Sequence, residues 1–180
     1  PLLFRPGADL VPRIAPTEQD PWRGRLLQGE AHDENAAALD GVAAHAGLFG
    51  TAGSVATFAR LVLRTFHENT LLGTPALMRT FATRTGVPGS SRALAWDTML
   101  PTSSCGTKLS PTSIGHTGFT GTSLWIDYER DLYVVFLTNR VHPTRANQKI
   151  ARVRPALHDA VVEALEGNGA RQGNAVAPGK

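Results

Sequence analysis

The 180-residue sequence has almost no cysteine, no long apolar run and little excess of either charge. Its single cysteine, Cys105, excludes an internal disulfide framework. No run approaches the roughly 18 apolar residues that a membrane-spanning helix needs, and the start lacks the pattern of a signal peptide. Lysine and arginine (18) barely exceed aspartate and glutamate (15), and the arginines form no stripe, so nucleic-acid binding is not expected.

The overall composition is that of a globular protein, with 42% hydrophobic and 18% charged residues. A chain of this length amounts to one domain and is long enough to bury a core. Prolines recur every few residues near the start, so the segment 1–31 is expected to be irregular. Bulky side chains become scarce near the end, which predicts a domain over 1–166 followed by a disordered tail over 167–180.

The clearest helix is predicted over 51–66. Thr51 is placed to cap it, and apolar residues recur at i, i+3, i+4, i+7 and i+8, which gives one continuous apolar face. Further helices are expected over 32–41, capped by Asp33, over 74–86, stopped by Gly86, and over 155–166, beginning at Pro155.

Strand signals concentrate in the second half of the chain. The segments 121–127 and 132–139 are rich in β-branched and aromatic residues and are joined by the turn 128–131, so they predict a hairpin. A further strand is plausible over 92–100, and the glycine-punctuated segment 43–50 is expected to be a buried loop. These elements predict an α/β protein of the α+β type, in which helices flank an antiparallel sheet.

The stretch His116-Thr117-Gly118 carries a chemical signal. A strand that binds an acyl substrate along its edge needs small residues, so that backbone N–H groups reach the ligand. It also benefits from a hydroxyl that holds a carboxylate and from a group that carries positive charge. Gly118, Thr117 and His116 supply these three, and the N–H of Phe119 is a candidate half of an oxyanion hole. Alternatively, Gly118 and Gly121 simply permit a bend in a sheet.

The surrounding segment "GHTGFTGTSLWIDYERDLYVVFLTNR" (115–140) closely resembles the C-terminal region of the serine β-lactamase and penicillin-binding-protein superfamily. The nearest branch is the class C-like group, which includes esterases and DD-peptidases. In that family a Lys-Thr-Gly or His-Thr-Gly strand edges the active site, and a partner strand, a strand ending in Asn and a C-terminal helix follow. Upstream, "AHAGLFGTAGSVATFARLVL" (44–63) resembles the loop and helix that precede this sheet. The resemblance spans about 1–166 and implies the C-terminal part of a β-lactamase/transpeptidase-like fold.

The resemblance also implies roles for individual residues. His116 matches the Lys/His position of the charge and proton network around the nucleophile, Thr117 matches a ligand-binding hydroxyl, and Phe119 supplies the oxyanion N–H. Asn139 matches a position near the acidic group of the substrate, although an asparagine that only turns the chain is the alternative. His45 lies in a loop that approaches the site in the family, and a histidine satisfied within the core is its alternative.

Histidine at the position of His116 is more typical of the peptidase and esterase branches. An imidazole titrates near neutrality, so the pH dependence is expected to differ from that of a Lys-Thr-Gly enzyme.

The family's nucleophile motif is not found in this sequence. No serine is followed by lysine three residues on, and neither Tyr-x-Asn nor Ser-x-Asn occurs. Both motifs precede the present region in the family, and the first residue is Pro1 rather than methionine. The segment 105–108 has the spacing with cysteine in place of serine, but it lies in a loop and is interpreted as a coincidence. The sequence is therefore expected to be the C-terminal half of a hydrolase, inactive by itself.

The first hypothesis is a serine hydrolase that acts on an amide or ester through an acyl-enzyme. It would use no metal or organic cofactor, and its partners would be an acyl substrate and the N-terminal half of the same fold. A β-lactam, a peptidoglycan peptide or a small ester is the substrate class. The family is often exported to the periplasm or cell envelope, but the sequence leaves the compartment open.

Two other hypotheses belong to different functional classes. The chain would be a non-catalytic fragment or remnant that binds a ligand or docks to a partner, or it would bind a metal through His32 and Asp33. The three consecutive residues His32, Asp33 and Glu34 cannot all face one ion from regular structure, which favours helix capping and surface charge instead.

Overall fold

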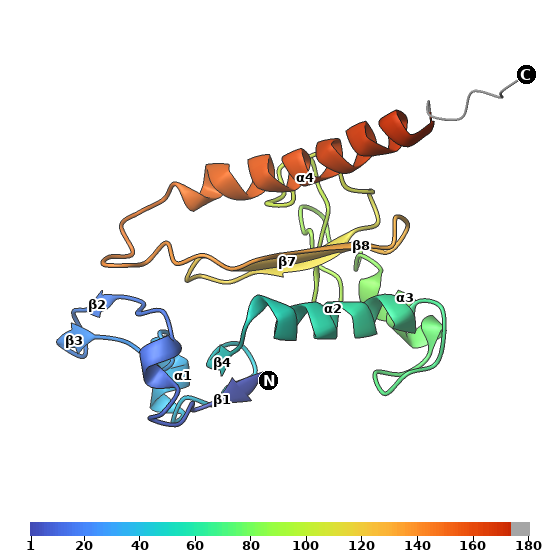
Figure 1. Cartoon of the computed structure of the whole chain (residues 1–180). Helices are drawn as coiled ribbons and strands as arrows, with labels where there is room; N and C mark the ends of the chain where they lie inside the picture. The colour runs from blue at the N-terminus through green and yellow to red at the C-terminus, as the bar shows by residue number, and fades with distance from the viewer. Residues whose placement is uncertain (174–180) are drawn as a thin grey trace, which may run out of the picture.

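The computed structural model describes residues 1–173 and has a mixed α/β fold (Figure 1). An antiparallel sheet lies between α4 (Ile150–Gly173) on one face and α2 (Ala52–Thr65) with α3 (Pro75–Ala82) on the other. The helix α1 (Glu34–Ala38) belongs to an N-terminal segment that lies beside the start of α2. An antiparallel sheet flanked by helices confirms the fold class expected from the sequence.

The central sheet has four antiparallel strands in the order β5-β6-β7-β8. Their bounds are β5 (Asp97–Thr98), β6 (Ile114–Thr117), β7 (Ser123–Asp127) and β8 (Leu132–Phe136). The pair β7–β8 is the predicted hairpin, whereas the strand expected over 92–100 shrinks to β5. Ala95 has a positive φ of 67°, which an extended strand cannot contain.

The two faces of the sheet bury different side chains because neighbouring residues of a strand point to opposite sides. Ile126 of β7 packs with Val62 of α2 and with Phe66, the C-cap of α2, in the larger cluster of buried side chains. Trp125, the preceding residue, packs with Val162 of α4 on the other face. The strand β7 thus contributes to the packing of both helices, and α2 also packs on β8.

The helix α2 begins and ends as the sequence predicts. The side chain of its N-cap, Thr51, accepts a hydrogen bond from the Ser54 N–H, which satisfies one of the unpaired donors of the first turn. By contrast, α3 ends at Ala82 rather than near Gly86, because Thr83 is already extended with ψ of 128°.

The helix α4 begins at Ile150, so the start predicted at Pro155 is wrong. A proline keeps a helical φ and costs one hydrogen bond in the ladder, so the helix continues through it. The tail expected over 167–180 overlaps the end of α4, and 174–180 lie outside the described residues. No helix within residues 1–173, α4 included, has the length and apolar character to cross a lipid bilayer.

The N-terminal segment has little regular structure, as expected. Its elements are β1 (Leu3–Phe4) paired with β4 (Leu48–Phe49), β2 (Gln19–Asp20) paired with β3 (Arg25–Leu26), and the 3-10 turn η1 (Val11–Arg13). The buried loop predicted over 43–50 is wrong, since His45 and Leu48 are exposed. The alanines and glycines of this loop offer little apolar surface, so burial would gain little free energy.

Gly115→Ala should destabilise the protein, because an added Cβ would lie 2.3 Å from the Trp125 ring and 2.5 Å from the Leu124 carbonyl oxygen. We expect urea unfolding followed by tryptophan fluorescence to give a loss of about 1–3 kcal/mol. Gly53→Ala in α2 is the matched control, because the nearest atom is 3.8 Å from the added Cβ and alanine favours helix by up to about 1 kcal/mol. Equal stability of the two variants would contradict this account of the packing.

Candidate active site

The strand β6 contains the first two residues of the His-Thr-Gly sequence, and one edge of the strand has no neighbouring strand there. β7 pairs with every residue of β6, but β5 reaches only as far as Gly115. The Gly118 N–H donates to the Thr122 carbonyl at 2.7 Å. Because alternate residues of a strand hydrogen-bond to the same neighbour, the backbone groups of Thr117 face away from β7. An extended ligand therefore has an open strand edge beside His116 and Thr117.

Two donors at this edge have no hydrogen-bond partner among the described residues. Among residues 1–173, the hydroxyl of half-buried Thr117 forms no hydrogen bond, and the N–H of Phe119 reaches no acceptor. The resemblance to the superfamily assigned functions to these two groups. Their roles in binding and catalysis stay predictions, but both groups are available for them.

Of the two glycines around Phe119, Gly121 is the more constrained. Its φ of +124° disfavours any side chain, whereas a Cβ on Gly118 would meet the Thr122 hydroxyl oxygen at 2.1 Å, the end of a side chain that can rotate. The conformation of Gly121 supports the alternative interpretation, in which Gly118 and Gly121 permit a bend in the sheet. A direct contact of Gly118 with substrate stays a prediction.

His116 lies beside a cation that the sequence did not point to. Its Nε2 is 2.8 Å from Nη1 of Arg92, and its Nδ1 is 2.9 Å from the carbonyl oxygen of Thr117. Arg92 precedes His116 by 24 residues and belongs to no recognisable motif. Only the fold, which brings the segment before β5 alongside β6, reveals this neighbour.

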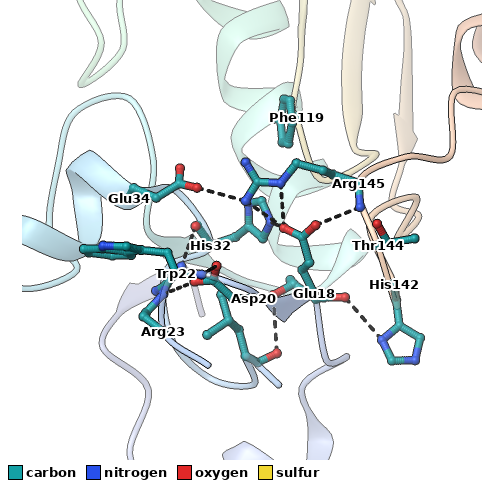
Figure 2. A network of polar contacts seen from close by, with 12 residues as sticks. Glu18, Asp20, Trp22, Arg23, His32, Glu34, Phe119, His142, Thr144 and Arg145 are labelled. Carbon is teal, nitrogen blue, oxygen red and sulfur yellow. Dashed lines mark hydrogen bonds and ion pairs between the residues drawn. The ribbon is translucent and has the colours of Figure 1, made fainter. Parts of the chain in front are cut away.

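A buried ion-pair network lies below the turn that follows His-Thr-Gly (Figure 2). Glu18 accepts hydrogen bonds from the backbone N–H and Nε of Arg145, each at 2.8 Å, and from Nε2 of His32 at 2.8 Å. Arg145 also donates to Glu34 at 2.9 Å. Burial alone would raise the pKa of Glu18, but the hydrogen bonds from Arg145 and His32 outweigh it and lower the pKa to about 2. Glu18 is therefore a carboxylate at neutral pH.

The network reaches the site through the ring of Phe119. Arg140 lies 4.1 Å and Arg145 lies 5.7 Å from the centre of this ring, and His32 stacks on it at 5.7 Å. Nε of Arg140 also donates to the Phe119 carbonyl at 2.8 Å. Both the side chain and the backbone of Phe119 are thus held in place. The expectation that His32 contributes surface charge is wrong, because Glu18 draws it into this buried cluster.

The metal hypothesis finds no support in the arrangement of His32 and Asp33. His32 turns to Glu18, whereas Asp33 caps α1 by accepting a hydrogen bond from the Ala36 N–H at 2.8 Å. Within residues 1–173, no group of three or more His, Cys, Asp or Glu side chains is placed to hold a metal ion. Helix capping by Asp33, the interpretation favoured from the sequence, is confirmed.

His45 and Asn139 make polar contacts with the N-terminal segment. His45 is 52% exposed and its Nε2 is 3.0 Å from the carboxylate of Asp33, so it is not a core histidine. Asn139 follows the end of β8 and donates its amide N–H to the carbonyl of Pro16. This contact ties the N-terminal segment to the sheet. The predicted roles of His45 and Asn139 in substrate binding are not tested by these contacts.

Cys105 is not placed as a nucleophile. It is fully buried, and this burial raises the pKa of its thiol to about 12, whereas a reactive cysteine needs thiolate character. Lys108, which would complete the motif-like spacing, pairs with Glu163 at 3.3 Å. The interpretation of 105–108 as a coincidence is supported.

Comparison with known proteins identifies the family. Residues 4–158 match the family model described as Beta-lactamase. The chain belongs to the Beta-lactamase family. Similar curated proteins, each named "Putative D-alanyl-D-alanine carboxypeptidase", come from Salmonella agona (strain SL483) and Escherichia coli (strain K12). Both are 34% identical, over 135 and 127 residues that cover 71% and 67% of this chain.

These relatives are much longer than the chain, which covers 31% and 29% of their lengths. A solved β-lactamase structure from Mycobacterium bovis matches 66% of this chain and 46% of its own, with a TM-score of 0.54 and 22% identity. This last likeness concerns the fold alone. Together the comparisons confirm the superfamily that the His-Thr-Gly region indicated.

Glu18→Gln should change how the free energy of unfolding depends on pH. A pKa of about 2 in the folded state, against an ordinary value of 4.5, means that the stabilisation is complete above 4.5 and is lost as the pH falls toward 2. The variant should lose about 1–3 kcal/mol at pH 7, because it weakens charge-assisted hydrogen bonds, while Arg145 is 38% exposed and keeps Glu34 as a partner. Its free energy of unfolding, measured in urea at several pH values, should fall less steeply below pH 4.5 than that of the parent.

The control for this experiment is Glu163→Gln, because Glu163 is 60% exposed and its one ion pair among the described residues is with Lys108 at the surface. It should keep the pH dependence of the parent protein. An unchanged acid slope in Glu18→Gln would mean that Glu18 is not held as a buried carboxylate.

Proposed function

We propose that this chain is the C-terminal part of a serine hydrolase that cleaves an amide or ester through an acyl-enzyme, with its nucleophile outside residues 1–180. The observation that carries the proposal is the open edge of β6, where the Thr117 hydroxyl and the Phe119 N–H have no partner among the described residues. Membership of the Beta-lactamase family supports this class of chemistry. No lysine follows a serine at the spacing of the family's nucleophile.

In the proposed reaction, the N–H of Phe119 is half of an oxyanion hole. It would stabilise the negative charge that develops on the carbonyl oxygen when the nucleophile attacks. The hydroxyl of Thr117 would hold the carboxylate of the substrate, and Gly118 would allow the turn that presents both donors. His116 would belong to the surrounding proton network. Placement on a strand and a tightly packed turn supports these roles, because such donors act only when they are held in position.

For the substrate, we favour a peptide that ends in D-alanyl-D-alanine. The similar proteins from Salmonella agona and Escherichia coli carry the name of a carboxypeptidase for this dipeptide. A histidine in the first position of the His-Thr-Gly motif also fits a peptidase or esterase better than a β-lactamase. A β-lactam and a small ester are the other members of the proposed class.

A second candidate function, docking to a partner, is supported by an exposed face at the start of α4. This face is formed by Lys149, Arg152, Val153, Ala156 and Leu157 and is open to solvent. We propose that the remainder of the β-lactamase-like fold covers it, since the chain covers 31% of its relatives.

The docking proposal predicts self-association of the 180-residue chain, because exposed apolar surface favours contact between copies. Sedimentation velocity should show dimers or larger species that increase with concentration and decrease in Val153→Ser, where the replaced side chain is 44% exposed. Leu71→Ser, at a side chain that is 84% exposed on another surface, should leave association unchanged. A chain that stays monomeric at all concentrations would contradict the proposal.

Acylation by a labelled penicillin tests the hydrolase proposal. The 180-residue chain should show no covalent adduct by intact mass, whereas a longer protein that adds the Ser-x-x-Lys segment should be acylated. In that longer protein, Thr117→Val should slow acylation about 10- to 100-fold, the effect of losing a hydrogen bond to a charged group.

Thr117→Ser is the matched control, because it keeps the hydroxyl and should retain most of the rate. Phe119 offers no such variant, since its proposed role belongs to the backbone. A stable adduct on a residue within 1–180, or equal rates for Thr117→Val and Thr117→Ser, would overturn the proposal.

A further inference from the structure

We propose that Arg92 is a positioning residue that holds the imidazole of His116 in the tautomer with its proton on Nδ1. The two side chains meet at the open edge of β6, with Nη1 of Arg92 2.8 Å from Nε2 of His116. The importance of this pair for catalysis rests on the proposed function. The tautomer of the ring follows from the geometry alone.

The chemistry of the two partners allows one tautomer of His116. A guanidinium has only N–H donors and stays protonated in proteins, so Nε2 must accept the hydrogen bond from Arg92. The ring proton then lies on Nδ1, which is 2.9 Å from the carbonyl oxygen of Thr117, an atom that can only accept. An imidazolium, or the tautomer with the proton on Nε2, would direct an N–H at the guanidinium. Both hydrogen bonds of the His116 ring therefore require the tautomer with the proton on Nδ1.

The backbone around Arg92 is fixed by local hydrogen bonds. Its carbonyl accepts from both the N–H and the hydroxyl of Thr85, each at 3.0 Å, and its N–H donates to the hydroxyl of Ser90 at 3.2 Å. It also forms a bridge with Asp97, the first residue of β5. The side chain thus reaches β6 just where β5 stops. Among residues 1–173, its side chain contacts His116 and forms no ion pair with a carboxylate.

This pairing changes the role that the sequence suggested for His116. The positive charge at the edge of β6 comes from Arg92, and the imidazole links that charge to the Thr117 carbonyl. The peptide unit of Thr117 is thereby oriented at the open edge, where the proposed substrate lies. Arg92 acts through His116 and need not touch the substrate.

Nitrogen-15 NMR of the 180-residue chain tests the inference directly. About two pH units above the usual histidine pKa of about 6.5, long-range proton–nitrogen spectra distinguish the two neutral tautomers. We expect His116, assigned by its absence in His116→Gln, to be mainly protonated on Nδ1. In Arg92→Met the ring should shift to the Nε2-protonated form that free imidazole prefers, with at least a tenfold change in the ratio. Arg92→Lys, which retains a cationic donor, should preserve the Nδ1-protonated form.

Arg60→Met is the matched control, because Arg60 is an exposed arginine of α2 whose side chain, among the described residues, hydrogen-bonds to Thr57 alone. It should leave the His116 spectrum unchanged. A His116 ring that is mainly protonated on Nε2 in the parent chain, or one that is identical in Arg92→Met, would overturn the inference. Neither result depends on catalysis, whereas acylation that is insensitive to Thr117→Val would overturn the proposed function and leave this tautomer in place.

Discussion

The buried carboxylate of Glu18 is the contact on which the arrangement of the N-terminal segment depends. Its own strands pair over two residues each, so little backbone pairing holds it to the rest of the protein. Glu18 is joined to Arg145, 127 residues later in the chain. A carboxylate removed from water is costly unless charge and hydrogen bonds compensate it. Arg145 and His32 provide both, which makes the position of the segment specific as well as stable.

The turn between β6 and β7 is held from two directions. From the N-terminal segment, His32 stacks on Phe119. From α4, Nη2 of the buried Arg154 donates to the carbonyls of Gly118 and Thr122 at 2.7 and 2.8 Å. Burial lowers the pKa of Arg154, but a guanidinium stays protonated in proteins, and these carbonyls replace part of the water that it loses on burial. A turn fixed in this way can present the Phe119 N–H in one orientation, as an oxyanion donor requires.

The sequence predicts those parts of the structure that depend on local or periodic patterns. The apolar face and Thr51 cap define α2, and the β-branched residues on both sides of 128–131 define the hairpin. The sequence identified the candidate site only through the His-Thr-Gly motif. It did not predict the contributions of Arg92 and Glu18, because long-range contacts between charged side chains leave no periodic signal. The prediction of a strand over 92–100 was wrong for a related reason, because the composition of this segment gives no sign of the left-handed backbone conformation of Ala95.

Packing and chemistry are not competing explanations of the glycines at 118 and 121. A Cβ on Gly118 would meet the Thr122 hydroxyl, which can rotate away, whereas Gly121 has a φ of +124° and lies against the backbone of Thr138 and Arg140. The conformational requirement of the turn is therefore strongest at Gly121. The turn starts at Gly118, whose N–H donates to the Thr122 carbonyl at 2.7 Å, and Phe119 is the next residue. The same turn that needs a glycine at 121 therefore also carries the proposed donor of Phe119.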